Sequence, residues 1–284
     1  MNKKSKLLSI LMTCTLIIGG LFGCSKSTTT ESDNVGSNAN SDSKKEITIK
    51  VAADLVPHAE ILEFVKPKLK EDGINLEIVT FDDSNQLNPA LDEKQIDANY
   101  FQHVPYLESV SKEKGYKFVV AGNIHVEPIG LYSNKIKNID EIKEGSKIAI
   151  TNDPSNEYRA LVLLESKGLI KLRKDIEDYN ATPKDIVENP KKLEFVEVDS
   201  GQLVRVLPDV DGAIINTNRI LEAKIDPETA LFREDGNSPY GNVVVVREGD
   251  ENREEIKTLI KHLTTQDVKE FIQEKYRVAV VASF

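Results

Sequence analysis

The chain has 284 residues, a formal net charge of −10 and two cysteines, and hydrophobic residues make up 39% of it. The acidic residues are dispersed, which argues against a nucleic-acid-binding protein and against a basic patch that would hold a membrane surface. The length allows one large or two medium-sized domains after an N-terminal export signal.

Residues 1–23 have the features of a lipoprotein signal peptide. Three lysines within the first six residues precede a short apolar run that ends at Phe22 and is followed by a polar tract. The run closes on Leu-Phe-Gly-Cys, which resembles the bacterial lipobox, so Cys24 is the predicted lipidated residue. An ordinary signal peptide with an incidental cysteine is the alternative. Removing residues 1–23 removes three lysines and no acidic residue, so the net charge becomes −13.

Residues 24–45 are rich in Ser, Asn and Thr and contain almost nothing apolar. Such a segment cannot bury enough surface to order itself, so it is a predicted disordered tether. A coil of this length spans roughly 25 Å on average. We therefore expect it to hold a globular body near the outer face of the cell membrane, anchored through the lipid on Cys24.

From residue 46 onward, strands and helices alternate. Residues 58–73 carry a helical stripe of apolar side chains, and Pro67 within it is expected to kink the helix or end its regular part. A short helix is expected after residue 88. Four segments with β-branched or alternating apolar residues are predicted strands: 46–53, 74–81, 117–124 and 129–133.

The alternation starts again near residue 146. Residues 152–168 are a predicted helix, whose N-cap candidates are Asp153, Ser155 and Asn156. Residues 181–189 are expected to begin another helix at a Thr182 cap. Further helices are predicted over 200–210 and 253–276, and further strands over 146–151, 193–199, 211–218 and 242–249.

This order of elements predicts an α/β protein with mostly parallel sheets in two lobes. We expect residues 46–133 and 240–284 to form lobe I, and residues 134–239 to form lobe II. Ligands of such sheets bind beyond the carboxyl ends of strands, which predicts a ligand cleft between the lobes. Hinge closure is expected along 129–133 and 242–246.

Enzyme motifs are absent from the sequence. It has no G-x-S-x-G elbow, Walker loop, H-E-x-x-H or G-x-G-x-x-G, so we expect neither an enzyme nor a cofactor. Three histidines could converge with a glutamate on zinc, but their spacing carries no metal motif. A metal-binding lipoprotein and an exported hydrolase therefore stay as remote alternatives. The residues concerned are His58, His103 and His125, with Glu60 or Glu127.

Arg159 lies in the first turn of the predicted helix over 152–168. A cation there opposes the helix dipole, whereas a bound carboxylate would pair with the guanidinium and with free N–H groups of the helix start. Asn216 follows an apolar strand, and Asn242 begins one. A buried amide needs a polar partner, and a ligand is one candidate. A solvated arginine and loop-capping asparagines are the alternatives.

Residues 99–106, Asn-Tyr-Phe-Gln-His-Val-Pro-Tyr, concentrate aromatic side chains in a chain with 6% aromatics. Flat rings with polar tips suit the wall of a binding slot, and a thioether gains from an aromatic neighbour. Tyr100 and His103 are the predicted wall residues. Phe101 and Tyr106 are expected to face the other way or to pack in the core.

Six segments resemble, in order, the NlpA-type methionine-binding lipoproteins, the substrate-binding proteins of a methionine ABC importer. The resemblance covers essentially all of residues 46–284. The segments are PHAEILE (57–63), NYFQHVPYLE (99–108), EPIGLYS (127–133), TNDPSNEYRAL (151–161), DVDGAIINTN (209–218) and YGNVVVV (240–246).

The resemblance implies a two-lobed, type II periplasmic-binding-protein-like fold. It implies capture of D- or L-methionine, or of a methionine-containing peptide, for delivery to an ABC permease with a cytoplasmic ATPase. It also implies site roles: Arg159 and Asn216 for the α-carboxylate, Asn242 as a further polar contact, Tyr100 and His103 beside the thioether. Glu127 is the implied acceptor for the ammonium group.

The chain departs from the family pattern at three places. Glu157 and Tyr158 stand where small residues often precede the arginine, and Gln-Leu-Val-Arg replaces the frequent Gln-Leu-Pro-Arg at 202–205. Arg219 stands where an aromatic or apolar residue is common. These differences leave open a methionine-containing dipeptide or another amino acid as the ligand, with the same fold.

Overall fold

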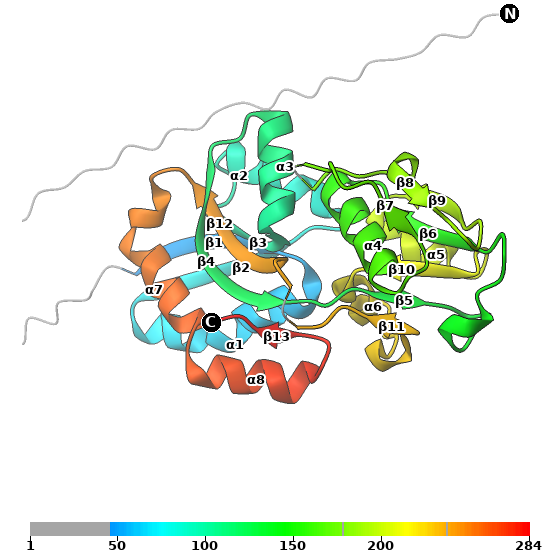
Figure 1. The fold of residues 1–284 in the computed structure, drawn as a ribbon. Coiled ribbons are helices and arrows are strands. Elements are labelled where there is room, and N and C mark those ends of the chain that lie inside the picture. The colour runs from blue at the N-terminus through cyan, green and yellow to red at the C-terminus, as the bar shows by residue number, and fades with distance from the viewer. Residues whose placement is uncertain (1–45, 178, 237) are drawn as a thin grey trace, which may run out of the picture. The chain divides into compact units, whose positions relative to one another are not determined.

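Two mixed β-sheets organise residues 46–177, 179–236 and 238–284, which a computed structural model describes (Figure 1). The predicted signal peptide, Cys24 and the predicted tether lie outside these residues. The strand order is β13-β4-β12-β3-β1-β2 in the first sheet and β11-β5-β10-β6-β9 in the second. We call each sheet with the helices packed on it the first or the second lobe. The two lobes confirm the predicted two-lobed α/β class, but the sheets are mixed rather than mostly parallel, because β12, β13, β5 and β11 pair antiparallel with their neighbours.

The first lobe contains six strands and five helices among the described residues. Its strands are β1 (Ile47–Ala53), β2 (Ile74–Thr80), β3 (Ala98–His103), β4 (Phe118–Val126), β12 (Gly241–Arg247) and β13 (Val281–Ala282). Its helices are α1 (Glu60–Glu71), α2 (Leu87–Asp92), α3 (Val104–Lys114), α7 (Glu254–Leu263) and α8 (Gln266–Tyr276).

The second lobe is built from one continuous part of the chain. Its strands are β5 (Gly130–Tyr132), β6 (Lys147–Thr151), β9 (Glu194–Val198), β10 (Gly212–Ile215) and β11 (Phe232–Arg233), and a small ribbon pairs β7 (Lys171–Leu172) with β8 (Ile186–Glu188). Its helices are α4 (Pro154–Ser166), α5 (Leu203–Val206) and α6 (Thr217–Glu222).

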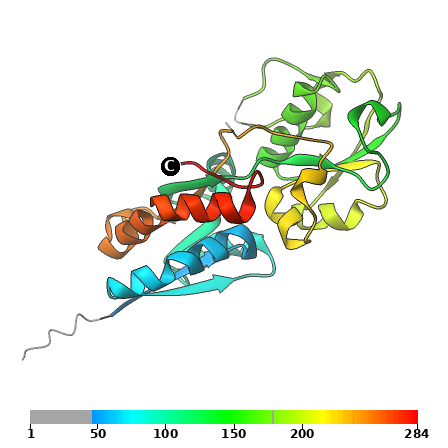
Figure 2. The same cartoon turned by 90° about the horizontal axis from the view of Figure 1, so that it is seen from below.

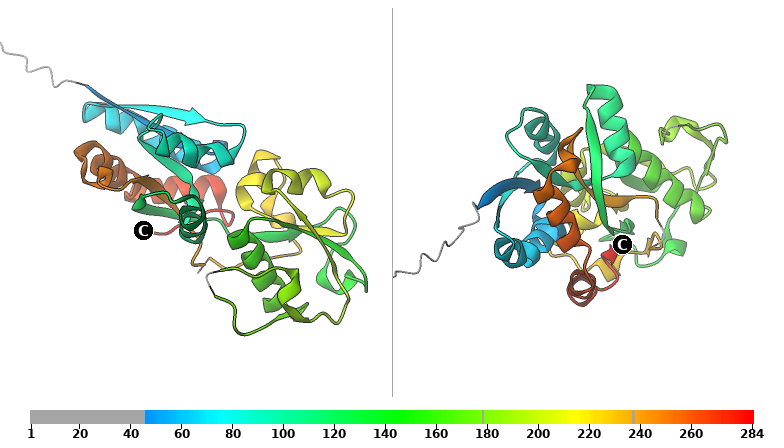
Figure 3. Two further views of the ribbon diagram at one scale, coloured as in Figure 1. Left: turned by 90° about the horizontal axis from the view of Figure 1, so that it is seen from above. Right: turned by 90° about the vertical axis from the view of Figure 1, so that its left-hand side faces the viewer.

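Helices cover both faces of the first sheet. The central strand β12 illustrates this, because it buries side chains on both faces. Its side chains point alternately to opposite faces: Val244 and Val246 pack in a core with α1, α7 and α8, while Val243 and Val245 pack in another with α2. Figures 2 and 3 show α1, α7 and α8 together on one side of the lobe. A strand buried on both faces needs an unbroken apolar run, which is what residues 243–246 provide.

Helix α1 continues through Pro67 to Glu71, so of the two expected effects, a kink or an end, the proline does not end the helix. Proline leaves the carbonyl of the residue four positions earlier without its helical donor. Here that residue is Glu63, and both Glu63 and Pro67 lie on the exposed side of the helix. Water can therefore satisfy the freed carbonyl.

The prediction of a helix over residues 181–189 is wrong. Thr182 and Asp185 form a capping box, but it opens only one 3₁₀ turn, Pro183–Asp185, and the chain then enters β8. The residues after the turn, Ile186 and Val187, are β-branched, and pairing with β7 stabilises an extended conformation for them.

Strand β5 belongs to the second sheet, because it pairs with β10 and β11. The lobe boundary predicted after residue 133 therefore lies too late in the chain. The described chain crosses between the sheets from Val126 to Gly130 and again from Arg233 to Gly241. β12 lies wholly in the first sheet, so we now expect the second hinge in the residues that precede β12.

No helix within the described ranges has both the length and the apolar character to cross a bilayer.

Candidate functional site

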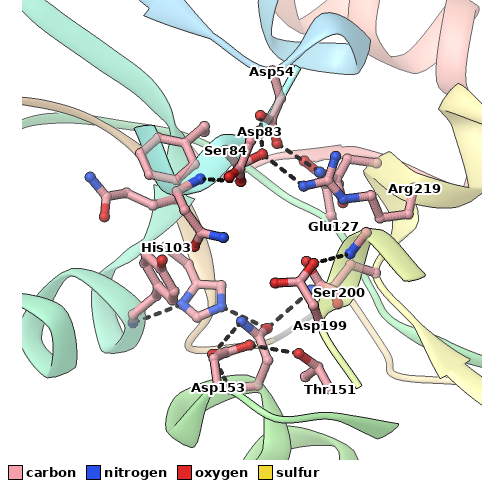
Figure 4. Close-up of a pocket in the computed structure, with 18 of the residues that line it drawn as sticks. Asp54, Asp83, Ser84, His103, Glu127, Thr151, Asp153, Asp199, Ser200 and Arg219 are labelled. Atoms are coloured by element: carbon pink, nitrogen blue, oxygen red, sulfur yellow. Dashed lines mark hydrogen bonds between the residues drawn. The ribbon is translucent and has the colours of Figure 1, made fainter. Parts of the chain in front are cut away.

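A cleft of about 450 Å³ lies between the lobes (Figure 4). Its walls come largely from the carboxyl ends of strands: Asp54 follows β1, His103 ends β3, Thr151 ends β6 and Asn216 follows β10. This is where an α/β sheet presents free backbone ends and loops to a ligand. The volume falls in the range of small-molecule sites, roughly 300–1,000 Å³.

Five of the six predicted ligand-binding residues line this cleft: His103, Glu127, Arg159, Asn216 and Asn242. They come from positions up to 139 residues apart in the chain, so only the fold brings them together.

Tyr100 is the exception. Its side chain is fully buried behind the cleft, and its hydroxyl donates a hydrogen bond to Nδ1 of His125. Phe101 faces the other way from Tyr100, as expected, but Phe101 and Tyr106 line the cleft while Tyr100 lies in the core, so the prediction of Tyr100 as a wall residue is wrong. β3 has a β-bulge here: Val244 pairs with Tyr100 and Val243 with Gln102, which leaves Phe101 as the extra residue of β3. A bulge re-aims side chains, and the sequence gives no sign of it.

Arg159 is 2% exposed and lies in the first turns of α4, whose N-cap is Asp153. Its Nε and Nη2 donate to the carboxylate of Glu234 at 2.9 and 2.5 Å, and Nη2 also donates to the carbonyl oxygen of Glu127 at 2.8 Å. The guanidinium lies over the ring of Tyr240, 4.2 Å from its centroid. Nη1 makes no hydrogen bond to the described residues. The arginine is therefore held rigidly with one nitrogen left for a ligand.

Asn156 connects two predicted site residues. Its Oδ1 accepts hydrogen bonds from Nε2 of His103 and Nδ2 of Asn216, both at 3.0 Å. Nδ1 of His103 accepts from the backbone N–H of Tyr106, so His103 caps helix α3. Burial, with the charge of Arg159, lowers the pKa of His103 to about 3. His103 is therefore neutral and its tautomer is fixed.

A second set of polar side chains lies at the floor of the cleft, where Glu127 and Asn242 line it and His58 and His125 are buried behind them. Nε2 of His125 donates to Oε1 of Glu127 at 2.8 Å, and Nε2 of His58 donates to Oδ1 of Asn242 at 3.0 Å. Burial lowers the pKa of His125 to about 3 and also lowers that of His58. Burial raises the pKa of Glu127, although the neighbouring His58 opposes this. Both imidazoles are therefore neutral near pH 7.

Two further hydrogen bonds link the lobes, at Asp54 and Ser84 of the first lobe. Nδ2 of Asn218 donates to Oδ2 of Asp54 at 2.8 Å, and Nη2 of Arg219 donates to Oγ of Ser84 at 2.7 Å. Of the positions that depart from the family pattern, Arg219 thus lies on the cleft wall. Tyr158 packs in the core of the second lobe and contacts the ring of Tyr179.

Sequence reasoning missed Glu234, Asn156 and Asp54 as members of the site. Asn156 was considered only as a helix cap, and Glu234 lies in a charged connecting segment with no local pattern. The clue for Glu234 is indirect: a buried arginine needs a carboxylate partner.

Glu157 is buried beside the site, and its Oε1 has no hydrogen-bond partner among the described residues. Its pKa is raised from 4.5 to about 7 by burial and by the carboxylates of Glu197, Asp153 and Asp185. Between these two values the folded state keeps a proton that the unfolded state has lost. The free energy of unfolding should therefore fall as pH rises from 4.5 to about 7.

The Glu157→Gln variant should lose this part of the pH dependence. We expect it to match the parent near pH 4.5 and to exceed it at pH 8 by on the order of 1 kcal/mol, because a neutral amide replaces a buried unpaired charge. Urea unfolding at several pH values measures this. Glu194→Gln, at an exposed position, is the control. Parallel pH curves for parent and Glu157→Gln would contradict the prediction.

The sequence profile of the NlpA lipoprotein family matches residues 49–284. The methionine-binding lipoprotein MetQ of Bacillus subtilis is 41% identical to the chain over 252 residues, which are 87% of this chain and 91% of that protein.

Solved structures show the same fold. A nutrient-binding protein from Burkholderia cenocepacia, bound to methionine, superposes with a TM-score of 0.80 and 45% identity over 83% of this chain and 100% of that chain. A periplasmic substrate-binding protein of an ABC transporter from Coxiella burnetii gives a TM-score of 0.79 and 43% identity, with 83% and 100% coverage.

Proposed function

The chain belongs to the NlpA lipoprotein family, and we propose that it is an extracytoplasmic solute-binding lipoprotein that captures methionine and delivers it to an ABC importer. The observation that carries this proposal is Arg159. Its buried guanidinium is fixed by Glu234 on one side and keeps Nη1 without a hydrogen bond to the described residues. A carboxylate of an amino acid is the natural partner for such a group.

The other cleft residues supply the remaining parts of an amino-acid site. Asn216 lines the same cleft as Arg159 and would donate to the same carboxylate. Glu127 offers a carboxylate to the ammonium group. Asn242 adds a polar contact on the floor. His103 and Phe101 would flank the thioether, which replaces the role first expected of Tyr100. Each of these roles uses a side chain that lines the cleft.

We propose binding without chemical turnover. The cleft histidines are neutral and hydrogen-bonded to structural partners, and the relatives named above are binding proteins. Release would be to a permease with a cytoplasmic ATPase, while lipidated Cys24 keeps the protein at the outer face of the cell membrane.

A methionine-containing dipeptide is the second candidate, and Arg219 favours it. This arginine gives the cleft a second cation besides Arg159. A longer ligand could use it for an additional carbonyl or carboxylate oxygen, in a cavity of about 450 Å³.

Isothermal titration tests the proposal. The full chain, unfolded and refolded to remove any bound ligand, should bind L-methionine one to one with a sub-micromolar dissociation constant. D-methionine and a methionyl dipeptide are titrated in parallel. Heat only with the dipeptide would select the second candidate. No heat with any of the three would refute the function.

A further inference from the structure

Three side chains from separate parts of the first lobe converge under the cleft. His58 lies in the helical turn Leu55–Ala59, His125 lies near the end of β4 and Glu127 follows β4. Nε2 of His58 and Nε2 of His125 lie 3.3 and 2.8 Å from Oε1 of Glu127, and all three atoms lie within 4.8 Å of one another. The residues are 1%, 0% and 5% exposed.

We propose that His58, His125 and Glu127 form a binding site for a divalent transition-metal ion of the zinc class, open toward the ligand cleft. Two imidazoles and one carboxylate are a donor set that zinc uses when a fourth position stays free for a water or a ligand. The proposed metal site shares Glu127 with the proposed methionine site, but the two inferences are tested with different probes, and metal binding is measured without methionine.

Both rings can present Nε2 to an ion. A metal on Nε2 requires the proton of the neutral imidazole to lie on Nδ1. For His125, the hydroxyl of Tyr100 lies at Nδ1 and can accept that proton's hydrogen bond, as an outer partner of a metal ligand does. For His58, Nδ1 makes no hydrogen bond to the described residues, so placing a proton there breaks no bond at that atom.

An ion can reach the site from the cleft. Glu127 and Asn242 both line the cleft, and Oδ1 of Asn242 lies 3.0 Å from Nε2 of His58. A carbonyl oxygen at this place can serve as a further oxygen donor or hydrogen-bond a metal-bound water. The remaining cleft histidine, His103, is excluded because Asn156 and the Tyr106 backbone engage its two nitrogens.

The competing interpretation is a purely structural network, in which the same side chains exchange hydrogen bonds. The two interpretations differ in whether a metal ion can replace the protons on Nε2. Zinc holds nitrogen ligands at about 2.0–2.1 Å, which puts neighbouring donor atoms of a tetrahedral site roughly 3.3 Å apart. Nε2 of His58 already lies 3.3 Å from Oε1 of Glu127, whereas Nε2 of His125 lies 2.8 Å from it and has to move outward slightly.

Metal binding by the untagged full chain decides between them. Equilibrium dialysis should give one Zn²⁺ per chain at micromolar concentration, and Co²⁺ should give the intense visible absorption of a four-coordinate site. His125→Gln and Glu127→Gln should weaken Co²⁺ binding about 100-fold or more, and Tyr100→Phe about 10-fold or more, the range measured for outer partners. The control is His262→Gln, because His262 bonds Asp72 on the surface and should leave binding unchanged.

A parent chain with no saturable Zn²⁺ or Co²⁺ binding at micromolar concentration would overturn the proposal. Equal binding in His125→Gln and Glu127→Gln would do the same, as would loss in His262→Gln alone. Thermal melting identifies variants that fail to fold. In that case electron spin echo modulation of Cu²⁺ bound to the parent counts coordinated imidazoles, and two are expected; none or one would overturn the site.

Discussion

Replacing Arg159 with alanine should weaken methionine binding about 100-fold or more. Truncating one partner of a buried, hydrogen-bonded charge pair costs roughly 2–5 kcal/mol, and each 1.4 kcal/mol is a factor of ten in affinity. Arg159→Lys should also bind poorly, because lysine keeps the charge but loses the planar group that bonds Glu234 and the ligand together. Isothermal titration of each variant with L-methionine is the measurement.

Two companion variants separate a binding effect from a folding effect. Arg159→Ala leaves Glu234 nearly buried without its partner, which alone destabilises the fold. The double change Arg159→Met with Glu234→Gln removes both charges and should restore much of the stability but not the binding. Arg173→Ala, on a half-exposed arginine, is the control. Near-parent affinity in Arg159→Ala would refute the carboxylate site.

Replacing Phe101 with alanine should weaken methionine binding roughly ten- to hundredfold, whereas Tyr100→Phe should change it little. Phe101 lines the cleft, so its loss removes an apolar wall and its contact with the thioether, together on the order of 1.5–3 kcal/mol. Tyr100 lies behind the wall and keeps its ring in the phenylalanine variant. Titrations are made with a chelator present, so that metal binding does not enter the comparison.

The opposite order of effects would contradict the arrangement of β3. If Tyr100→Phe lost affinity and Phe101→Ala kept it, the bulge at Phe101 would have to be absent in the binding conformation. Thermal melting of both variants shows whether a change in affinity follows from a change in stability.

Much of the fold could be predicted from local pattern. Residues 243–246 and the stripe of α1 carry periods that identify a buried strand and an amphipathic helix. The pattern failed for β5 and for residues 181–189. A three-residue strand has the same alternation in either sheet, and Thr182 followed by Pro183 begins a helix and a single 3₁₀ turn equally well.

Part of the site was predictable from single residues, and the place of Glu127 in it came from the family resemblance. Arg159 was found because a cation at the start of a helix opposes the helix dipole. Asn216 and Asn242 were found because a buried amide at one end of a strand needs a polar partner. Glu234 and Asn156 could not be found in this way. Their partners lie 75 and 60 positions away in the chain, so their contacts exist only in the folded protein. Tyr100 was predicted from the concentration of aromatic residues, which does not tell which ring meets the cleft and which lies in the core.

The position of β12 also bears on how an exported chain matures. β12 pairs with β3 on one side and β4 on the other, yet it follows every strand of the second sheet in the chain. While the C-terminal segment is still crossing the membrane, the second sheet can be complete, but β3 and β4 would expose unpaired backbone groups. Such edges invite pairing with other chains, and they make the unfinished protein a substrate for periplasmic or surface proteases and chaperones. Arrival of β12 closes both edges at once and brings Asn242 to the cleft, so completion of the fold and completion of the binding site are the same event.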